Sequence, residues 1–427
     1  MLSTVEAKTL NSYVFISDYL YFFFYLLQII SMKNRSNILL KVFVIIFLAA
    51  LWQGVLTGQV ITGAARTGEY LPLLNGKKVA VVANQTSMIG ETHLVDSLLS
   101  LGINIKRIFS PEHGFRGTAD AGEHLDDYND VKTGLPVISL YGKHHKPVKE
   151  DMEGLDIVLF DIQDVGLRFY TYISTMHYVM EACAENNVDF LVLDRPNPNG
   201  FYVDGPVLDT ALRSFVGMHP VPVVHGMTVA EYAQMINGER WLRDSLKCNL
   251  KYVKCENYTH KTYYDLPVKP SPNLPNLRSI YLYPSLCFFE GTCMSVGRGT
   301  DFPFQIFGHP DYPDMGFSFT PRSIEGEAAN PKYKGEVCNG VDLSHIPFNF
   351  VHNNCRLVLD WLIDAYSNME NKDKFFNNYF DKLAGNSILR EQIITGKSKW
   401  IIYASWKSDI EDFKIIRKKY LLYKDFE

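Results

Sequence analysis

From residue 77 onward, short apolar runs alternate with amphipathic stretches, and this alternation constrains the fold more than any other feature of the sequence. The apolar runs cover residues 79–83, 103–109, 137–140, 157–160 and 190–193, while 93–101 and 171–185 have helical spacing. Thr228 and Glu231 have the spacing of a capping box, which predicts the start of another helix. Buried strands that alternate with helices are typical of a parallel sheet. The sequence therefore predicts an α/β fold with a mostly parallel sheet.

The proline distribution suggests a division into two domains. Residues 266–276 contain four prolines, which predicts either a linker or a rigid wall of a cleft. We expect a first domain over 59–265 and a smaller α/β domain over 277–427, with the active-site cleft between them. Helices are expected in the second domain at 355–366, 387–395 and 409–420, the last opened by a capping box of Ser408 and Glu411.

The amino terminus has the pattern of an export signal. Basic residues between 33 and 41 precede an apolar run at 42–52, and small and polar residues follow at 54–59. The run is too short to favour a spanning helix. We expect translation to start at Met32, residues 1–58 to be an upstream extension plus a signal peptide, and the protein to be exported to the periplasm or beyond in a bacterium. Another apolar run at 19–30 leaves a membrane hairpin as the alternative.

Composition excludes several classes of protein. The net charge of −5 and the pI of about 6.2 give no general reason to bind nucleic acid. The seven cysteines are odd in number and form no C-x-x-C pair, so we expect mostly buried thiols rather than a disulfide framework or a zinc site. The G-x-G-x-x-G, P-loop and G-x-S-x-G patterns are missing from the sequence, so no cofactor is expected.

Polar loops follow the expected strands, and ligands of open α/β sheets bind at this edge. The loops read NQTS at 84–87, SPEHGFRG at 110–117, YG at 141–142, DIQDVG at 161–166 and DRPNP at 194–198. A glycine-rich loop at 291–299 is expected to face them from the second domain. The candidate substrate-binding residues are Asn84, Gln85, Arg116, Gln163, Asp164, Arg168, Tyr170, Asp194, Arg195, Asn197 and Arg298.

Glu112 is the leading catalytic candidate. It follows a strand and Pro111, which fixes the backbone, and it precedes His113. A buried carboxyl group that stays protonated can donate its proton to a leaving oxygen. The alternative is a surface glutamate paired with Arg116, and His113 either orients Glu112 or has a structural role. We expect no metal centre, because the adjacent pair His144 and His145 is a poor chelator and no H-E-x-x-H occurs.

Glycoside hydrolysis needs a second carboxylate or the acetamido group of the substrate. The candidates for the second carboxylate are Glu123, Asp161, Asp164, Asp194 and Glu290, of which Glu290 is preferred as a catalytic residue. Two internal ion pairs are considered, Asp194 with Arg195 and Asp164 with Arg168. Each arginine could instead hold a carboxylate of the substrate.

Taken together, these loops resemble the NamZ-like family of exo-β-N-acetylmuramidases, formerly a family of unknown function. GP at 205–206, EGT at 290–292, GRGT at 297–300 and YLLY at 420–423 extend the resemblance over residues 60–427. It implies a Rossmann-like domain joined to a smaller one, and release of N-acetylmuramic acid from non-reducing ends of peptidoglycan fragments. In that family the glutamate at the position of Glu112 is catalytic. Residues 399–403 are more apolar than the resemblance leads us to expect.

The resemblance also implies the partners. The substrate would be a muramic acid glycan derived from peptidoglycan, and its lactyl carboxylate would bind Arg168, Arg195 or Arg298. We expect no nucleic acid and no stable membrane partner beyond export. Two alternatives are a metal-dependent cell-wall hydrolase or deacetylase and a non-catalytic glycan-binding protein. The stereochemistry, the tolerance of stem peptides and the oligomeric state stay open.

Overall fold

The computed structural model describes residues 58–117, 126–142 and 144–427. The expected start at Met32, the signal peptide and Glu123 lie outside the described residues. Among the helices described, none is both long and apolar enough to cross a membrane.

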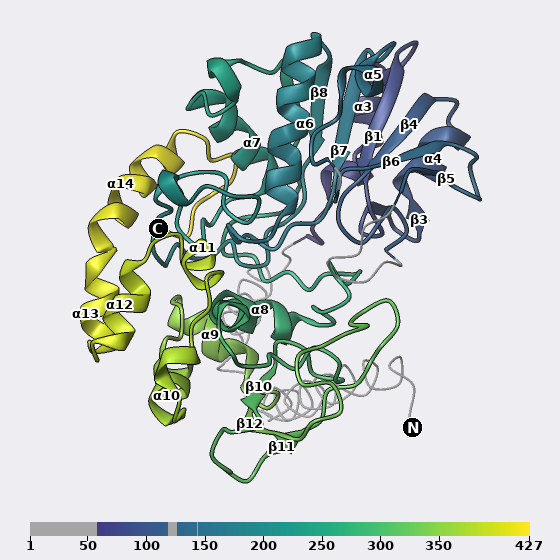
Figure 1. Ribbon diagram of the computed structural model, residues 1–427. Helices are drawn as coiled ribbons and strands as arrows, with labels where there is room; N and C mark the ends of the chain where they lie inside the picture. The colour runs from purple at the N-terminus through teal and green to yellow at the C-terminus, as the bar shows by residue number, and fades with distance from the viewer. Residues whose placement is uncertain (1–57, 118–125, 143) are drawn as a thin grey trace, which may run out of the picture. The chain divides into compact units, whose positions relative to one another are not determined.

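A seven-stranded sheet forms the centre of the first half of the chain (Figure 1). Its strands lie in the order β5-β6-β4-β1-β7-β8-β9, and only β5 runs antiparallel to its neighbour. Counted along the chain, the six parallel strands have the order 3-2-1-4-5-6 of the Rossmann fold, which confirms the predicted sheet. The strands are β1 (Lys78–Ala83), β4 (Asn104–Ser110), β5 (Tyr128–Asn129), β6 (Pro136–Ser139), β7 (Ile157–Asp161), β8 (Asp189–Leu193) and β9 (Leu250–Val253).

Helices cover both faces of this sheet because its strands are apolar on both sides. In β1, Val79 and Val81 pack on one face in a cluster with α3 (Thr67–Leu74) and α4 (Leu94–Ser100). Ala80 and Val82 belong to the cluster on the other face, which includes residues of α6 and α7. The helices of that second face are α5 (Lys149–Met152), α6 (Tyr172–Asn186) and α7 (Val229–Gly238).

The predicted capping box at the start of α7 is present. Glu231 Oε2 accepts the Thr228 backbone N–H at 2.9 Å, and the Glu231 backbone N–H reaches Thr228 Oγ1 at 3.4 Å. The second predicted box is wrong. The helix α14 (Lys407–Lys418) begins before Ser408, and its N-cap makes no side-chain hydrogen bond.

We call residues 60–265 the N-lobe and residues 277–427 the C-lobe. The C-lobe contains a three-stranded antiparallel sheet in the order β10-β12-β11, which lies at the edge of the lobe beside a set of mostly short helices (Figure 1). Its elements besides α14 are α8 (Leu277–Leu286), β10 (Ile306–His309), β11 (Ser318–Phe319), β12 (Cys338–Asp342), α9 (Phe348–Asn354), α10 (Asp360–Asn368), α11 (Phe380–Ala384), α12 (Ile388–Ile394) and α13 (Lys399–Ser405).

The helix predicted at 355–366 begins later, at Asp360, and this shift has a local cause. Cys355 has φ 47° and closes α9, so the chain must turn before α10 can start. The helices predicted at 387–395 and 409–420 are present within two residues of their predicted ends, as α12 and α14. All seven cysteines are free thiols, and five of them are buried.

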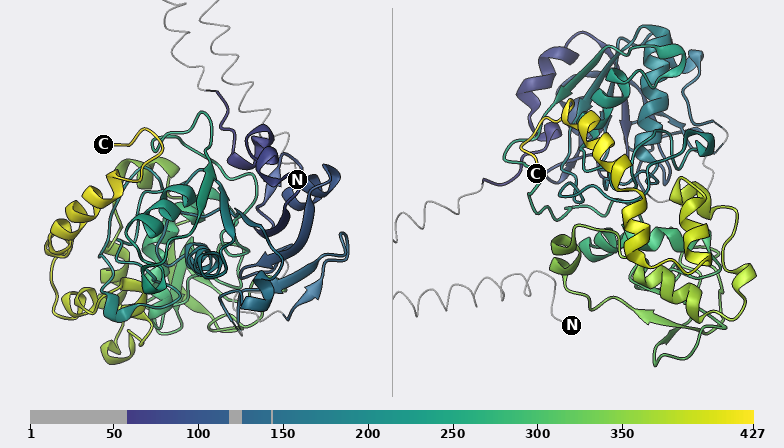
Figure 2. Two further views of the ribbon diagram at one scale, coloured as in Figure 1. Left: turned by 90° about the horizontal axis from the view of Figure 1, so that it is seen from above. Right: turned by 90° about the vertical axis from the view of Figure 1, so that its left-hand side faces the viewer.

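The two lobes share one hydrophobic core. A single cluster of buried side chains extends from the sheet face under α6 and α7 through α8 into α10, α11 and α14. The last helix runs back along both lobes (Figure 2). Its fully buried Arg417 donates to Gly226 O at 2.7 Å, and Tyr423 donates to Asp194 Oδ2 at 2.5 Å. The tail thus fixes the C-lobe against the N-lobe.

Candidate active site

A small recess and a wider cleft lie beyond the carboxyl ends of β4, β6 and β7. The recess has a volume of about 70 Å³ and the cleft about 680 Å³. Both are lined by Glu112, Phe169, Thr171, Tyr283 and Arg298, so the recess opens into the cleft. The residues come from both lobes, as the sequence predicted for the cleft. This is also the edge where ligands of Rossmann-like sheets bind.

A tight turn after β4 places Glu112 at the recess. The Gly114 N–H donates to Pro111 O at 3.1 Å, and His113 has φ 71°. A positive φ at the third position of a four-residue turn is the geometry of a type II turn, which is costly for a residue other than glycine or asparagine. Backbone strain of this kind persists where the surroundings impose it, often at functional sites. The half-buried Glu112 carboxylate lies 3.5 Å from Thr171 Oγ1.

Arg116 anchors this loop and does not pair with Glu112. Its guanidinium donates to both carboxylate oxygens of Asp130, at 3.1 and 2.9 Å, and lies 3.5 Å from Asp96. Hydrogen bonds to Asp130 and Asp96 raise the pKa of Arg116, and their effect outweighs the opposite effect of burial. Arg116 and Gln85 line a separate groove on the other side of the loop. The alternative of a Glu112–Arg116 pair is therefore wrong.

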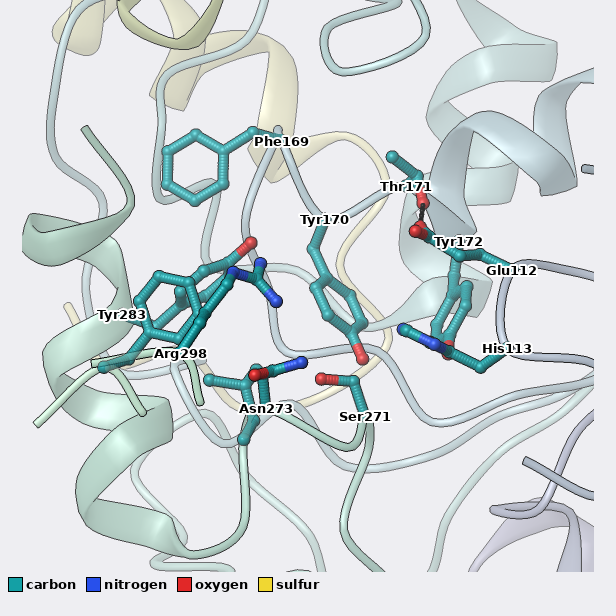
Figure 3. A pocket seen from close by; sticks show the side chains of 12 residues that line it. Glu112, His113, Phe169, Tyr170, Thr171, Tyr172, Ser271, Asn273, Tyr283 and Arg298 are labelled. Carbon is teal, nitrogen blue, oxygen red and sulfur yellow. Dashed lines mark hydrogen bonds between the residues drawn. The ribbon is translucent and has the colours of Figure 1, made fainter. Parts of the chain in front are cut away.

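Tyr170 stands in the middle of the recess, between Glu112 and Arg298 (Figure 3). Its hydroxyl donates to Pro270 O at 2.9 Å, and burial raises its pKa well above the ordinary value. Gln85 Nε2 reaches the same carbonyl at 3.2 Å. The proline-rich segment is thus held as a wall of the site, and its Ser271 and Asn273 line the recess.

Arg298 faces Glu112 from the C-lobe. Its Nε donates to Glu290 Oε1 at 2.8 Å, and its guanidinium lies 4.9 Å from the centre of the Phe304 ring. Burial would lower the pKa of Arg298, but the Glu290 carboxylate raises it overall. Glu290 lines the wider cleft together with Lys332, whose Nζ donates to Thr292 O at 2.7 Å. Glu327 also lines the cleft and pairs with Lys269 at 3.2 Å. Two cations, Arg298 and Lys332, and two carboxylates, Glu290 and Glu327, therefore lie on this wall.

Arg168, a candidate for binding the substrate carboxylate, has a different position. It is fully buried and donates to four backbone carbonyl oxygens. Two of these belong to the N-lobe and two to the C-lobe: Pro206, Val221, Leu383 and Ala384, at 2.7 to 2.9 Å. Burial lowers its pKa to about 9. The side chain joins the two lobes, and its considered pair with Asp164 is not formed.

Arg195 also forms its ion pair within the protein. Its Nε and Nη2 donate to the two carboxylate oxygens of Asp161, at 2.6 and 2.9 Å, and both side chains are buried. The considered Asp194–Arg195 pair is therefore wrong. Asp194 instead accepts hydrogen bonds from Thr228 Oγ1 at 2.8 Å and from Tyr423. Of the three arginines considered for the lactyl carboxylate, Arg298 alone lines the recess and the cleft.

The remaining candidates are buried and shape the loops. Asn84 Oδ1 accepts from the Thr86 N–H at 2.9 Å, and Gln163 Nε2 donates to Pro196 O at 2.7 Å. Asn197 Nδ2 donates to Met227 O at 2.9 Å. Asp164 accepts from the Gly166 N–H at 2.6 Å, and burial raises its pKa to about 7. These residues hold the rim in shape and are not among the side chains that line the recess or the cleft.

Sequence reasoning missed several residues of the cleft. Lys332 follows a segment without a recognisable motif, and Phe215 and Val216 lie in an irregular loop. The sequence shows Tyr141 only as a residue that follows an expected strand, yet it lies beside Glu112, and burial together with the Glu112 charge raises its pKa. Within residues 58–117, 126–142 and 144–427, no group of three or more histidines, cysteines or carboxylates is arranged to hold a metal ion.

A Rossmann-like sheet, a second lobe and a cleft lined by carboxylates and an arginine define a two-lobed α/β protein with a candidate site for glycoside chemistry. The chain belongs to the NamZ family of exo-β-N-acetylmuramidases: the N-terminal domain of that family matches residues 79–278 and the C-terminal domain matches residues 281–423. The resemblance inferred from the loops is thereby confirmed.

Relatives support this assignment. The chain is 39% identical over 377 residues to the peptidoglycan β-N-acetylmuramidase NamZ of Bacillus subtilis, covering 83% of this chain and 89% of the relative. Two solved structures of DUF1343-family proteins from Bacteroides fragilis are similar. The first has a TM-score of 0.81 and 50% identity over 86% of this chain and all of that one. The second has a TM-score of 0.72 and 30% identity over 86% and 99% of the two chains.

Proposed function

We propose that this protein is an exo-acting glycoside hydrolase that releases N-acetylmuramic acid from the non-reducing ends of peptidoglycan fragments. The observation that carries the proposal is that Glu112 and Arg298 line one recess, in a chain of the NamZ family. Glu112 supplies the acid–base group that glycoside hydrolysis requires, and Arg298 supplies a cation for an acidic sugar.

In this mechanism Glu112 is the general acid. It gives its proton to the glycosidic oxygen as the bond between that oxygen and C1 of the muramic acid breaks. Water then supplies a hydroxyl group to C1, and the proton left over restores Glu112. The turn from Pro111 to Gly114 and the anchor formed by Arg116 and Asp130 fix the loop from which the carboxyl group acts.

Arg298 and Lys332 select the acidic sugar. Glu290 pairs with Arg298, and Glu327 pairs with Lys269 outside the wall. Of the two cations and two carboxylates that line the wall, one positive charge therefore stays available for the lactyl carboxylate, which N-acetylglucosamine lacks. Glu290 orients Arg298 through Nε. The guanidinium is directed into the recess toward Tyr170 (Figure 3). Replacing Arg298 by Lys keeps the charge but removes the planar fork, so kcat/KM on muramic acid substrates should fall.

The test of the acid role is Glu112→Gln. General acid catalysis is typically worth about 10²–10⁴-fold, so kcat on the natural disaccharide should fall by about that factor. A nitrophenyl glycoside has a better leaving group and should lose much less. Glu153→Gln, an exposed glutamate on the N-lobe surface, is the matched control and should leave both rates unchanged. Equal, small losses on both substrates would remove Glu112 from this role.

We further propose that the protein is exported, with translation from Met32 and cleavage between about residues 54 and 59. The order of basic, apolar and small residues after Met32 supports this. Amino-terminal sequencing of the native protein tests it. An intact Met1 terminus in a membrane fraction would contradict it.

A further inference from the structure

One wall of the cleft is apolar and aromatic, and the mechanism above does not use it. At its centre is the tip of a tight turn. The backbones of Ser214 and Gly217 exchange two hydrogen bonds, at 2.9 and 3.0 Å, and this places Phe215 and Val216 at the tip. Both of these side chains line the cleft that Glu112 also lines. The tip is tied to α6, because Ser174 Oγ donates to Phe215 O at 2.6 Å.

The ring of Phe215 is held in a fixed orientation. His145 stacks on it with ring centres 4.0 Å apart and an angle of 17° between the planes. Tyr178 lies nearly parallel to both rings, at 6.4 Å from each. Tyr141 packs against Phe215 at 6.3 Å. Phe215 is nevertheless only half-buried, so a supported aromatic surface is left open beside the catalytic candidate. Binding sites for organic ligands are typically lined by such aromatic side chains.

The two walls of the cleft differ in charge, and Glu112 lines the same cleft as both of them. Arg298, Glu290 and Lys332 form the charged wall, while Phe215 and Val216 lie on the side of Tyr141. The two sugars of a muramic acid disaccharide differ in the same way. The muramic acid carries a lactyl carboxylate, whereas the N-acetylglucosamine that leaves is neutral. Among the described side chains that line the cleft, the cations Arg298 and Lys332 lie on the charged wall, so a carboxylate packed on Phe215 would lose hydration without meeting a lining cation.

We propose that Phe215 forms the subsite for the leaving N-acetylglucosamine, whose apolar C–H face packs on the open side of the ring. This inference rests on the proposed function and adds the orientation of the substrate. Muramic acid lies toward Arg298, the glycosidic oxygen lies at Glu112, and the neutral sugar lies against Phe215. Phe215 is then a specificity-determining residue for the leaving group, separate from the residues that bind muramic acid.

The experiment compares two substrates that differ only in the leaving group. The first is the disaccharide of N-acetylmuramic acid β-linked to N-acetylglucosamine. The second is β-N-acetylmuramyl fluoride, which has no leaving sugar. Phe215→Ala should lower kcat/KM for the disaccharide about tenfold or more, the order expected for losing the buried area of an aromatic contact. It should leave kcat/KM for the fluoride within about twofold.

Two further variants separate this role from a structural one. Phe215→Trp keeps an aromatic face and should restore most of the activity on the disaccharide. Phe350→Ala removes an exposed phenylalanine of α9 and should change neither substrate. Free N-acetylglucosamine should inhibit the wild-type enzyme and Phe215→Trp competitively, and it should inhibit Phe215→Ala more weakly. Circular dichroism and thermal midpoints show whether each variant folds.

Three results would overturn the inference. Equal losses on disaccharide and fluoride would place Phe215 against the muramic acid. Unchanged kcat/KM on both, with unchanged inhibition by N-acetylglucosamine, would show that no sugar packs on the ring. A wild-type protein that cleaves neither substrate would refute the proposed function itself, and this result differs from the other two because it appears without any substitution.

Discussion

Replacing Arg168 by Lys should destabilise the protein without any direct effect on sugar recognition. The guanidinium donates to four carbonyl oxygens, two in each lobe, at 2.7 to 2.9 Å. A lysine ammonium is a single point with three donors, so it cannot reach both pairs of carbonyls. Hydrogen bonds to charged groups contribute about 1.5–3 kcal/mol each. Losing two of them predicts a loss of about 3–6 kcal/mol in the free energy of unfolding.

That loss is a large share of the roughly 5–15 kcal/mol by which proteins are usually stable. Urea titration followed by circular dichroism measures it. Arg213→Lys is the matched control, because Arg213 is exposed and directly precedes the turn that carries Phe215. This variant should keep the wild-type urea midpoint. A variant Arg168→Lys with wild-type stability and a specific loss of affinity for muramic acid would refute this reasoning. It would return Arg168 to the role of a substrate ligand.

Three other substitutions test buried polar contacts of the N-lobe. Asp161→Asn leaves Arg195 buried without its counter-charge and should cost about 3–5 kcal/mol in urea titrations; an unchanged midpoint would show that the pair is dispensable. Burial would raise the pKa of Glu181, but its contacts with His177 and Lys146 lower it to about 2. Its stabilisation is therefore complete above about pH 4.5 and fades as the pH falls toward 2, so Glu181→Gln should flatten the change in urea midpoint between pH 6 and 3.5. Thr228→Ala removes the cap of α7, worth about 1 kcal/mol, and the hydrogen bond to the buried Asp194, worth about 1.5–3 kcal/mol, so the free energy of unfolding should fall by about 2.5–4 kcal/mol, read from the thermal midpoint.

The sheet could be predicted from the sequence because its strands are apolar on both faces and its helices are amphipathic. These patterns are local, and the parallel order then follows from a few packing rules. The helix starts predicted for the C-lobe were less accurate than the strands predicted for the N-lobe. Ser408 and Glu411 have the spacing of a capping box, but the helix α14 already begins at Lys407. The preceding helix, α13, ends at Ser405, only two residues before that start. Trp406, the single residue between the two helices, takes the N-cap position instead of Ser408.

The candidate site could be predicted only in part. The position of Glu112 followed from its place after a strand, which is a local property. The partners of the arginines were not predictable, because Arg168 bonds carbonyls more than 200 residues away and Arg195 bonds Asp161 from another strand end. A buried arginine in a loop motif looks the same in sequence as one that binds a ligand. Lys332 and Phe215 lack any motif and reach the cleft only through the fold.

The most direct test of the proposed activity is the rate of nitrophenol release from two chromogenic glycosides, β-N-acetylmuraminide and β-N-acetylglucosaminide. The two differ by the lactyl group for which Arg298 and Lys332 are proposed to select. We expect the wild-type enzyme to cleave the muraminide, with or without a chelator, and to leave the glucosaminide nearly intact. Comparable cleavage of both, activity that the chelator abolishes, or binding of the muraminide without any nitrophenol release would contradict the account.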